Sequence, residues 1–255
     1  VSLDGDVTLG ADISITTSND AISFNHTIDG GQALVLSSGT GTITVSDKIG
    51  AATSGTLTAL TINAGNGETS AGSIILSGDI GSTSQVGVSG VTKIGNTSTA
   101  EITFGGNLYR TTGSATYAAS GTAPSNQTGS FDMNSGGTGI KFQSADNAIT
   151  FSTGTIDLAE GVDLTVDTDA SGGAITIGSI RGTIASSNDT AETVTLDAGT
   201  GTTAVGAIGA TTEIGSVTIG SAQDGDITLN GAIVANGAVS LDGDVTLGAD
   251  ISITT

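Results

Sequence analysis

Short runs in which apolar residues alternate with Thr or Ser recur along the whole chain. An apolar residue at every second position predicts a strand with one buried face. Between the runs stand Gly, Asn and Asp pairs such as Asn66-Gly67, which accept the positive φ of tight turns. No window offers ten residues of helical periodicity without a glycine, so the pattern predicts an all-β fold. The clearest runs are Asp6–Gly10, Asp12–Thr16, Ala21–Asn25, Ala33–Ser37, Thr42–Ser46, Ala174–Gly178, Thr193–Asp197, Ser216–Gly220 and Asp226–Asn230.

The spacing of these runs favours a parallel β-solenoid over an antiparallel sandwich. Sandwich strands are separated by turn signals every 8–12 residues, whereas here the strand centres lie roughly six to ten residues apart, which leaves room for a corner and not for a hairpin. Three such strands make a coil of roughly 20–24 residues, and roughly ten coils at about 4.8 Å each span ~50 Å. The residues expected to face the core are Val7, Leu9, Ile13, Ile15, Ile43, Val45, Ile175, Ile177, Val194, Leu196, Ile227 and Leu229.

The chain repeats its own beginning: VSLDGDVTLGADISITT occupies residues 1–17 and again residues 239–255. Seventeen identical residues do not arise by chance, so we interpret residues 1–255 as one continuous solenoid segment, a 238-residue period plus a short overlap. We expect residues 239–255 to adopt the backbone of residues 1–17, displaced along one axis by roughly ten coils. Because a cut solenoid exposes unpaired edges, the expected partners are adjacent repeats of the same polypeptide.

Composition limits both the core and the partners. The chain has 41 Gly, no Cys and 3% aromatic residues, so it can fill a narrow core but not a wide one, and it forms no disulfide or thiolate metal site. Its net charge of −20 argues against nucleic acid and against anionic membrane surfaces. No apolar run approaches the roughly 18 residues of a membrane span.

Residues 105–139 depart from the strand rhythm. They contain the only Pro, the only Met, both Tyr and one of the two Arg residues. We expect a loop or small hairpin that leaves the solenoid, with Tyr109, Arg110 and Tyr117 as candidate contact residues. The alternative is an outward loop whose two tyrosines cover an exposed patch.

One long stretch carries a family resemblance. The phrases LDAGTG, GAIG and IGSVTI within Ala191–Thr255 resemble the strand repeats of giant bacterial surface adhesins of the filamentous-haemagglutinin type. INAGNG (Ile62–Gly67), followed by GSIILSGDIG (Gly72–Gly81), is a looser echo. The resemblance implies a right-handed parallel β-helix that is exported and displayed as a long extracellular fibre at the bacterial cell surface. It transfers no functional residue, because the motifs consist of structural residues.

The sequence contains few residues of the types that catalyse reactions. His26 is the only histidine, and we interpret it as a corner residue rather than as the base of a hydrolytic triad. Polysaccharide-degrading enzymes do use β-helices, but they need paired carboxylates and aromatic sugar platforms, and aromatic residues are scarce here. We therefore expect no enzyme and no resident cofactor.

Calcium is the one metal that the sequence suggests. Acidic residues are densest in IDLAEGVDLTVDTDASGG, and stacked coils place carboxylate oxygens above one another at distances that suit calcium. The nonapeptide repeat of calcium-binding β-rolls is absent, so acids solvated on an outer face remain the alternative. The candidate ligands are Asp157, Glu160, Asp163, Asp167 and Asp169.

Together these observations predict a structural shaft segment of an extracellular bacterial fibre or adhesin, acting as spacer and scaffold and serving attachment to cells or surfaces. Two alternatives remain. One is a module that binds glycans or a neighbouring fibre through residues 105–139, and the other is a polysaccharide-degrading β-helix enzyme.

Overall fold

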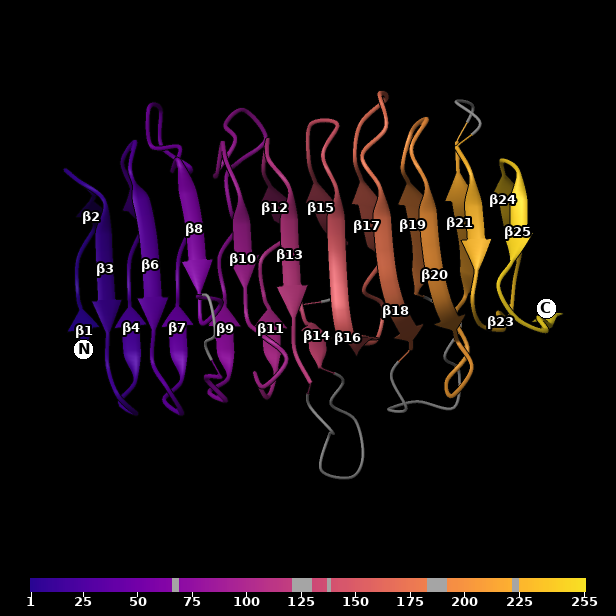
Figure 1. The fold of residues 1–255 in the computed structure, drawn as a ribbon, viewed down its shortest axis with the longest axis horizontal. Helices are drawn as coiled ribbons and strands as arrows, with labels where there is room; N and C mark the ends of the chain where they lie inside the picture. The colour runs from indigo at the N-terminus through magenta and orange to yellow at the C-terminus, as the bar shows by residue number, and fades with distance from the viewer. Residues whose placement is uncertain (66–68, 121–129, 137–138, 183–191, 222–224) are drawn as a thin grey trace.

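The chain winds into a parallel β-solenoid of about nine turns. The structure is a computed structural model, and it describes residues 1–65, 69–120, 130–136, 139–182, 192–221 and 225–255. These residues form strands and turns, with no helix among them. The two ends of the chain lie at opposite ends of the long axis (Figure 1). The predicted all-β solenoid is confirmed.

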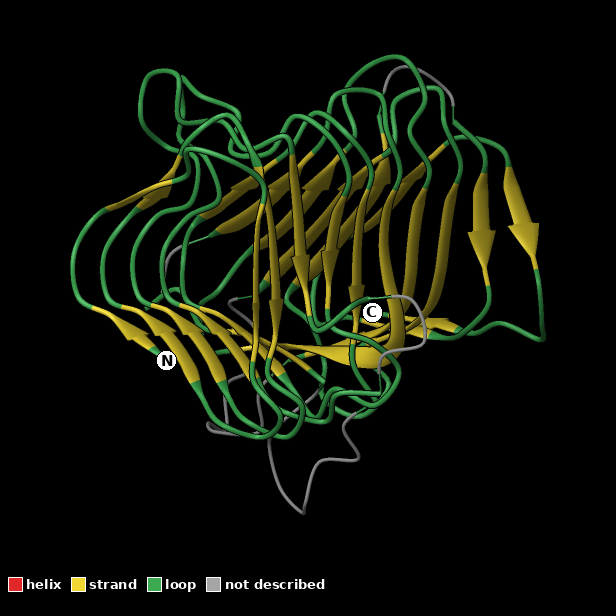
Figure 2. Cartoon of the chain, turned by 60° about the vertical axis from the view of Figure 1, so that its left-hand side comes forward, coloured by secondary structure: helices red, strands yellow, loops and turns green. Residues whose placement is uncertain are grey.

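Each coil, meaning one turn of the solenoid, contributes strands to three faces (Figure 2). The first face contains β1 (Ser2–Leu3), β4 (Ile22–Phe24), β7 (Ile43–Val45), β9 (Ile74–Leu76), β11 (Ile102–Phe104), β14 (Phe131–Met133), β23 (Ile233–Val234) and β26 (Ile253–Thr254). The second face contains β2 (Val7–Thr8), β5 (Ile28–Asp29), β12 (Leu108–Arg110), β15 (Ile140–Gln143), β17 (Leu164–Asp167), β19 (Thr193–Asp197), β21 (Ser216–Gly220) and β24 (Val239–Asp242). The third face contains β3 (Ile13–Thr16), β6 (Ala33–Ser37), β8 (Ala59–Ile62), β10 (Thr92–Ile94), β13 (Ala115–Ala118), β16 (Ile149–Leu158), β18 (Ile175–Arg181), β20 (Thr203–Ile208), β22 (Ile227–Leu229) and β25 (Val245–Leu247).

Three long strands join the third face to the first. β16, β18 and β20 begin on the third face and run around the corner, so that their second halves continue the first face between β14 and β23. On the second face, single bridges at Ile49 and Ile80 connect β5 to β12. Each face is therefore a continuous parallel ladder along the axis.

Apolar residues stack on their equivalents in the next coil. On the first face Ile22, Ile43, Ile74 and Ile102 pair in register, and all four are fully buried. The alternating Ser and Thr residues point outward, as the period of two requires. Because each coil covers the apolar row of its neighbour, a narrow core suffices.

The predicted core is largely confirmed. Val7 and Ile15 are partly buried and pack against the core, whereas Ile13, in the first coil, is 37% exposed. In the described structure this coil is covered on one side only, which explains the exposure. The nine expected residues that are buried are Leu9, Ile43, Val45, Ile175, Ile177, Val194, Leu196, Ile227 and Leu229.

Glycine allows the coils to approach at their corners. A Cβ on Gly113 would lie 2.3 Å from the carbonyl oxygen of Gly90, and a Cβ on Gly106 would lie 2.6 Å from that of Gly78. Both contacts join one coil to the next. Any larger residue would force the coils apart, which accounts for much of the high glycine content.

The expected excursion at residues 105–139 is corrected by the structure. β12, β13 and β14 lie within this stretch and continue the ladders of the solenoid, while residues 121–129 and 137–138 lie outside the described part. The aromatic residues that suggested a surface loop are buried. The alternation pattern misses these strands because each has only three or four residues and carries aromatic or small side chains in place of the Ile and Val seen elsewhere.

The aromatic side chains between residues 104 and 151 form one interior cluster. The Tyr109 ring stacks on Phe142 and the Tyr117 ring stacks on Phe151, each with 4.8 Å between ring centroids. Phe104 meets all four of these rings edge-on. Such pairs add about 0.5–1.5 kcal/mol each to the burial of their area, so this stretch contributes the bulkiest part of the core.

The two copies of the repeated segment each supply three strands in succession, but they start on different faces. β1 pairs with β4 on the first face, whereas β24 pairs with β21 on the second. β25 and β26 then follow on the third and first faces. The period therefore advances nine turns plus one face, which is about 45 Å along the axis at the strand spacing.

This one-face rotation corrects the expected pure displacement by ten coils. Coils differ in length, because Ile22 pairs with Ile43, 21 residues later, whereas Ile43 pairs with Ile74, 31 residues later. A period of 238 residues therefore need not make a whole number of turns. The strand pattern of the segment is retained, and only its position around the axis changes.

Candidate functional site

Carboxylates at the corners connect successive coils. Asp12 Oδ1 accepts the backbone N–H of Ala33 at 2.9 Å. Asp163 Oδ1 accepts both the N–H and the Oγ1–H of Thr193, each at 2.8 Å. Hydrogen bonds to an ionised acceptor are roughly twice as strong as neutral ones. Some of the acidic side chains thus stabilise the stacking of successive coils.

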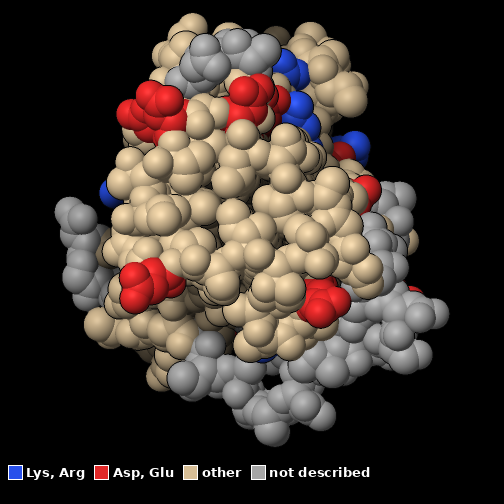
Figure 3. Space-filling view, turned by 90° about the vertical axis from the view of Figure 1, so that its right-hand side faces the viewer, with Lys and Arg blue, Asp and Glu red and all other residues tan. Residues whose placement is uncertain are grey.

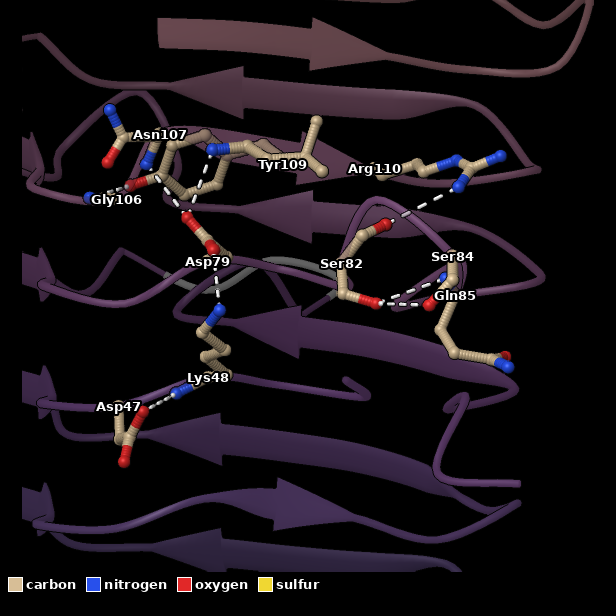
Figure 4. A network of polar contacts seen from close by, with 11 residues as sticks. Asp47, Lys48, Asp79, Ser82, Ser84, Gln85, Gly106, Asn107, Tyr109 and Arg110 are labelled. Carbon is tan, nitrogen blue, oxygen red and sulfur yellow. Dashed lines mark hydrogen bonds and ion pairs between the residues drawn. The ribbon is translucent and has the colours of Figure 1, made fainter. Parts of the chain in front are cut away.

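Asp79 is the most connected of these corner residues (Figure 4). It accepts the backbone N–H groups of Asn107 and Leu108 at 2.8 and 3.1 Å. The Nζ of Lys48 lies 3.0 Å from its second carboxylate oxygen. Because these partners come from the coils on either side, one carboxylate links three coils.

The three expected contact residues do not form a contact loop. Tyr109 and Tyr117 are each only 1% exposed. The Tyr109 hydroxyl donates to the carbonyl of Leu76 at 3.2 Å and accepts the N–H of Gly106 at 3.0 Å. Burial raises the pKa of both tyrosines, so both phenols stay neutral. Arg110 alone keeps part of its side chain at the surface.

Arg110 is itself tied to the scaffold. Its Nη1 donates to the carbonyl oxygens of Ser82 and Thr83 at 3.3 and 3.0 Å, and Figure 4 shows it beside this corner. These bonds use part of the donor capacity of the guanidinium.

The calcium candidates are distributed over different corners and faces. Asp157 pairs with Arg181 on the first face, and Asp163 caps the strand of the next coil. Asp167 lies on the second face with one oxygen 2.8 Å from the Nζ of Lys141. Each of these carboxylates thus has a protein partner already.

The remaining titratable groups add no convergent site. Asp169 accepts the N–H of Ala170 at 2.9 Å, and Glu160 lies in the turn after β16. His26 is half exposed, with Nε2 3.8 Å from Asp4 Oδ1. Within the described ranges, no three carboxylate or imidazole groups come together in a way that suits a metal ion. Calcium binding stays a prediction.

The first face carries an outward row of polar residues that the sequence pattern does not reveal. Thr103, Asp132, Asp157 and Arg181 are register partners on β11, β14, β16 and β18. Neighbouring members therefore lie about 4.8 Å apart along the face. No local motif marks this row, because its members are 24–29 residues apart and meet only through the coil register.

The row contains two carboxyls in different environments. Burial, together with the negative charges of Glu101 and Asp157, raises the pKa of Asp132 to about 6. Arg181 donates to both oxygens of Asp157, with 2.8 Å between Nη2 and Oδ2, and this bond raises the pKa of the guanidinium. A carboxyl that takes up a proton near pH 6 thus lies beside one that is paired with a cation.

A shallow hollow lies at the Arg181 end of this row. Its volume is about 180 Å³, and Thr155, Ser179 and Thr211 line it together with Arg181. Sites for drug-sized ligands typically occupy about 300–1,000 Å³. The hollow therefore suits at most a small group.

The described residues include no helix long and apolar enough to cross a membrane.

Comparison with known proteins finds no relative of this chain. No family model matches the chain, and neither a curated protein nor a solved structure was found to match it.

Proposed function

We propose that this chain is a shaft segment of a long extracellular bacterial fibre or adhesin, in which it acts as spacer and scaffold. The observation that carries the proposal is the continuity of all three strand ladders from the first coil to the last. A load along the axis is shared by three parallel ladders and by one unbroken apolar core. The extracellular and bacterial setting, and any role in attachment, rest on the resemblance of residues 191–255.

The acidity of the chain fits this role. A net charge of −20 over a rod about 45 Å long makes neighbouring shafts repel one another and keeps them soluble. Lateral association would then require cations or a lowered pH.

Electron microscopy of concatemers tests the shaft directly. Proteins that carry one, two and four copies of residues 1–238, each closed by residues 239–255, should appear as unbranched rods. Their length should grow by about 45 Å per added period. Separate beads, or compact particles of constant length, would refute the proposal.

A second candidate is a surface that binds or cleaves a polysaccharide. It is favoured by one observation, the pair Asp132 and Asp157, whose unequal environments resemble the division of labour between acid and base carboxyls. Asp132 also lies within residues 105–139, the stretch through which the alternative glycan- or fibre-binding module would act. Turnover of any member of a polysaccharide panel, abolished by both Asp132→Asn and Asp157→Asn, would establish this candidate. Binding without turnover, lost in the same variants, would indicate a glycan-binding module.

A further inference from the structure

A buried carboxylate lies at the corner between the first and second faces. Glu192 directly precedes β19 and is 0% exposed. Its Oε1 accepts the backbone N–H of Gly161, in the preceding coil, at 2.9 Å. Its Oε2 is also buried but has no hydrogen-bond partner among the described residues. Burying a charged oxygen without a partner is costly, so such an atom often marks the place of an ion or a water molecule.

No basic side chain neutralises this carboxylate. The five Lys and Arg residues of the chain all lie in its described part. Three of them pair with aspartates elsewhere. Arg110 donates to two carbonyl oxygens, and Lys93 is exposed on the third face. The charge of Glu192 is therefore balanced by a proton or by a cation from solution.

A second buried oxygen without a partner lies at the same corner, one coil further on. Thr212 Oγ1 has no hydrogen-bond partner in the described structure either. The carbonyl of Thr212 accepts the N–H of Gly182 at 3.3 Å, and the carbonyl of Glu192 accepts that of Gly215 at 2.8 Å, so the two coils are in close contact here. The one comparable atom among the described side chains, Thr92 Oγ1, belongs to the third face.

Gly182 leaves space beside these oxygens. A Cβ on Gly182 would lie 3.7 Å from Glu192 Oε2 and 2.7 Å from the carbonyl oxygen of Glu213. A carboxylate oxygen and a carbonyl oxygen thus border the space that a side chain would fill. Thr212 is only partly buried and Glu213 is exposed, so this space lies just below the surface, within reach of ions from solution.

We propose that Glu192 Oε2, Thr212 Oγ1 and the carbonyl oxygen of Glu213 hold a calcium ion at this corner. Calcium takes oxygen ligands at about 2.3–2.6 Å, so one ion joins oxygens up to about 5 Å apart, too far for a direct hydrogen bond. Magnesium suits the corner less well, because it usually keeps several of its waters. Since Glu192 also binds Gly161, the ion connects three successive coils. The site goes beyond the proposed role as a shaft and does not depend on it.

The ligand set explains why neither the sequence nor a search for acidic clusters marks this site. It combines one carboxylate with neutral oxygens, whereas no group of three acidic or imidazole side chains suits a metal within the described ranges. With a single carboxylate we expect weak binding, with a Kd of roughly 10⁻⁴–10⁻³ M. Acidic side chains are scattered over the surface seen in Figure 3, and a net charge of −20 concentrates cations around the protein.

Thermal unfolding of the whole chain tests the site. At about 10 mM calcium, the Tm should exceed the Tm in EDTA by about 3–10 °C. Sodium chloride of the same ionic strength should leave the Tm nearly unchanged. Glu192→Gln keeps an acceptor for Gly161 but removes the charge, so this variant should lose the calcium response. Glu160→Gln is the matched control, because it removes an exposed acid at the same corner, and it should keep the response.

Isothermal titration calorimetry gives a second readout that does not depend on unfolding. The unaltered chain should bind one calcium ion that Thr212→Val, a change of nearly constant shape, binds several-fold more weakly. The proposal is overturned if calcium raises the Tm no more than sodium chloride does, as a protonated Glu192 would require. A response that survives in Glu192→Gln, or that is lost equally in Glu160→Gln, also overturns it, and so does an unchanged affinity in Thr212→Val.

Discussion

Asp132 gives the sharpest prediction, because its environment opposes ionisation. Burial and the neighbouring charges of Glu101 and Asp157 raise its pKa from 3.8 to about 6. A raised acid pKa favours the protonated folded state, so the folded protein loses stability as the pH rises from about 4 to about 6. Above about pH 6 the full cost of ionising Asp132 remains. The Asp132→Asn substitution removes this charge at nearly constant shape.

The magnitude follows from the shift. Two pKa units correspond to at most about 3 kcal/mol, and solvent screening at this partly exposed position reduces the cost to about 1–2 kcal/mol. Asp132→Asn should therefore stabilise the chain by about that amount at pH 7.5, which is roughly 2–6 °C in Tm for a chain of this size. At pH 3, below the unfolded pKa of 3.8, the gain should vanish.

Thermal unfolding followed by circular dichroism at both pH values measures the effect. Asp20→Asn is the matched control, because Asp20 is exposed, and its change should stay within about 0.5 kcal/mol at either pH. A variant that is destabilised at pH 7.5, or equally stabilised at both pH values, would refute the burial argument.

Three other substitutions probe the packing. Gly113→Ala should lower Tm by several degrees, since its Cβ would meet a carbonyl 2.3 Å away, whereas Gly31→Ala, with nothing within 4 Å, should be near neutral. Phe104→Ala, at the centre of the aromatic cluster, should cost about 3–5 kcal/mol in denaturant unfolding. Arg181→Met should cost roughly 3 kcal/mol by leaving the buried carboxylate of Asp157 unpaired, and adding Asp157→Asn should restore most of the loss. Equal stability of the single and double variants would contradict that pairing.

The sequence predicted the solenoid because its signals are local. Alternation in runs such as Thr42–Ser46 and Thr193–Asp197 fixes which residues face inward, and both runs form strands with buried apolar positions. Residues 105–139 were predicted to leave the solenoid because their strands are short and carry aromatic side chains, which weakens the local alternation of apolar and polar residues. Tyr109 and Tyr117 suggested a surface, whereas their rings fill the core.

Features that depend on the register between coils could not be predicted from the sequence alone. The pairing of Asp132 with Asp157 requires knowing that 25 residues separate equivalent positions in two particular coils. Elsewhere the separation is 21 or 31, so no fixed period finds such neighbours. The rotation of the repeated segment by one face has the same origin, because it accumulates from unequal corners along the chain.

The central claim, a continuous solenoid whose period advances by nine turns and one face, is tested most directly by a disulfide that only this phase permits. Thr218 and Ser240 are exposed register partners on β21 and β24. Thr218→Cys/Ser240→Cys should therefore form a disulfide within one chain under mild oxidation. A period without rotation would place Thr246, the copy of Thr8, on the second face next to β21, so efficient bonding in Thr218→Cys/Thr246→Cys, with free thiols in the first variant, would contradict the account.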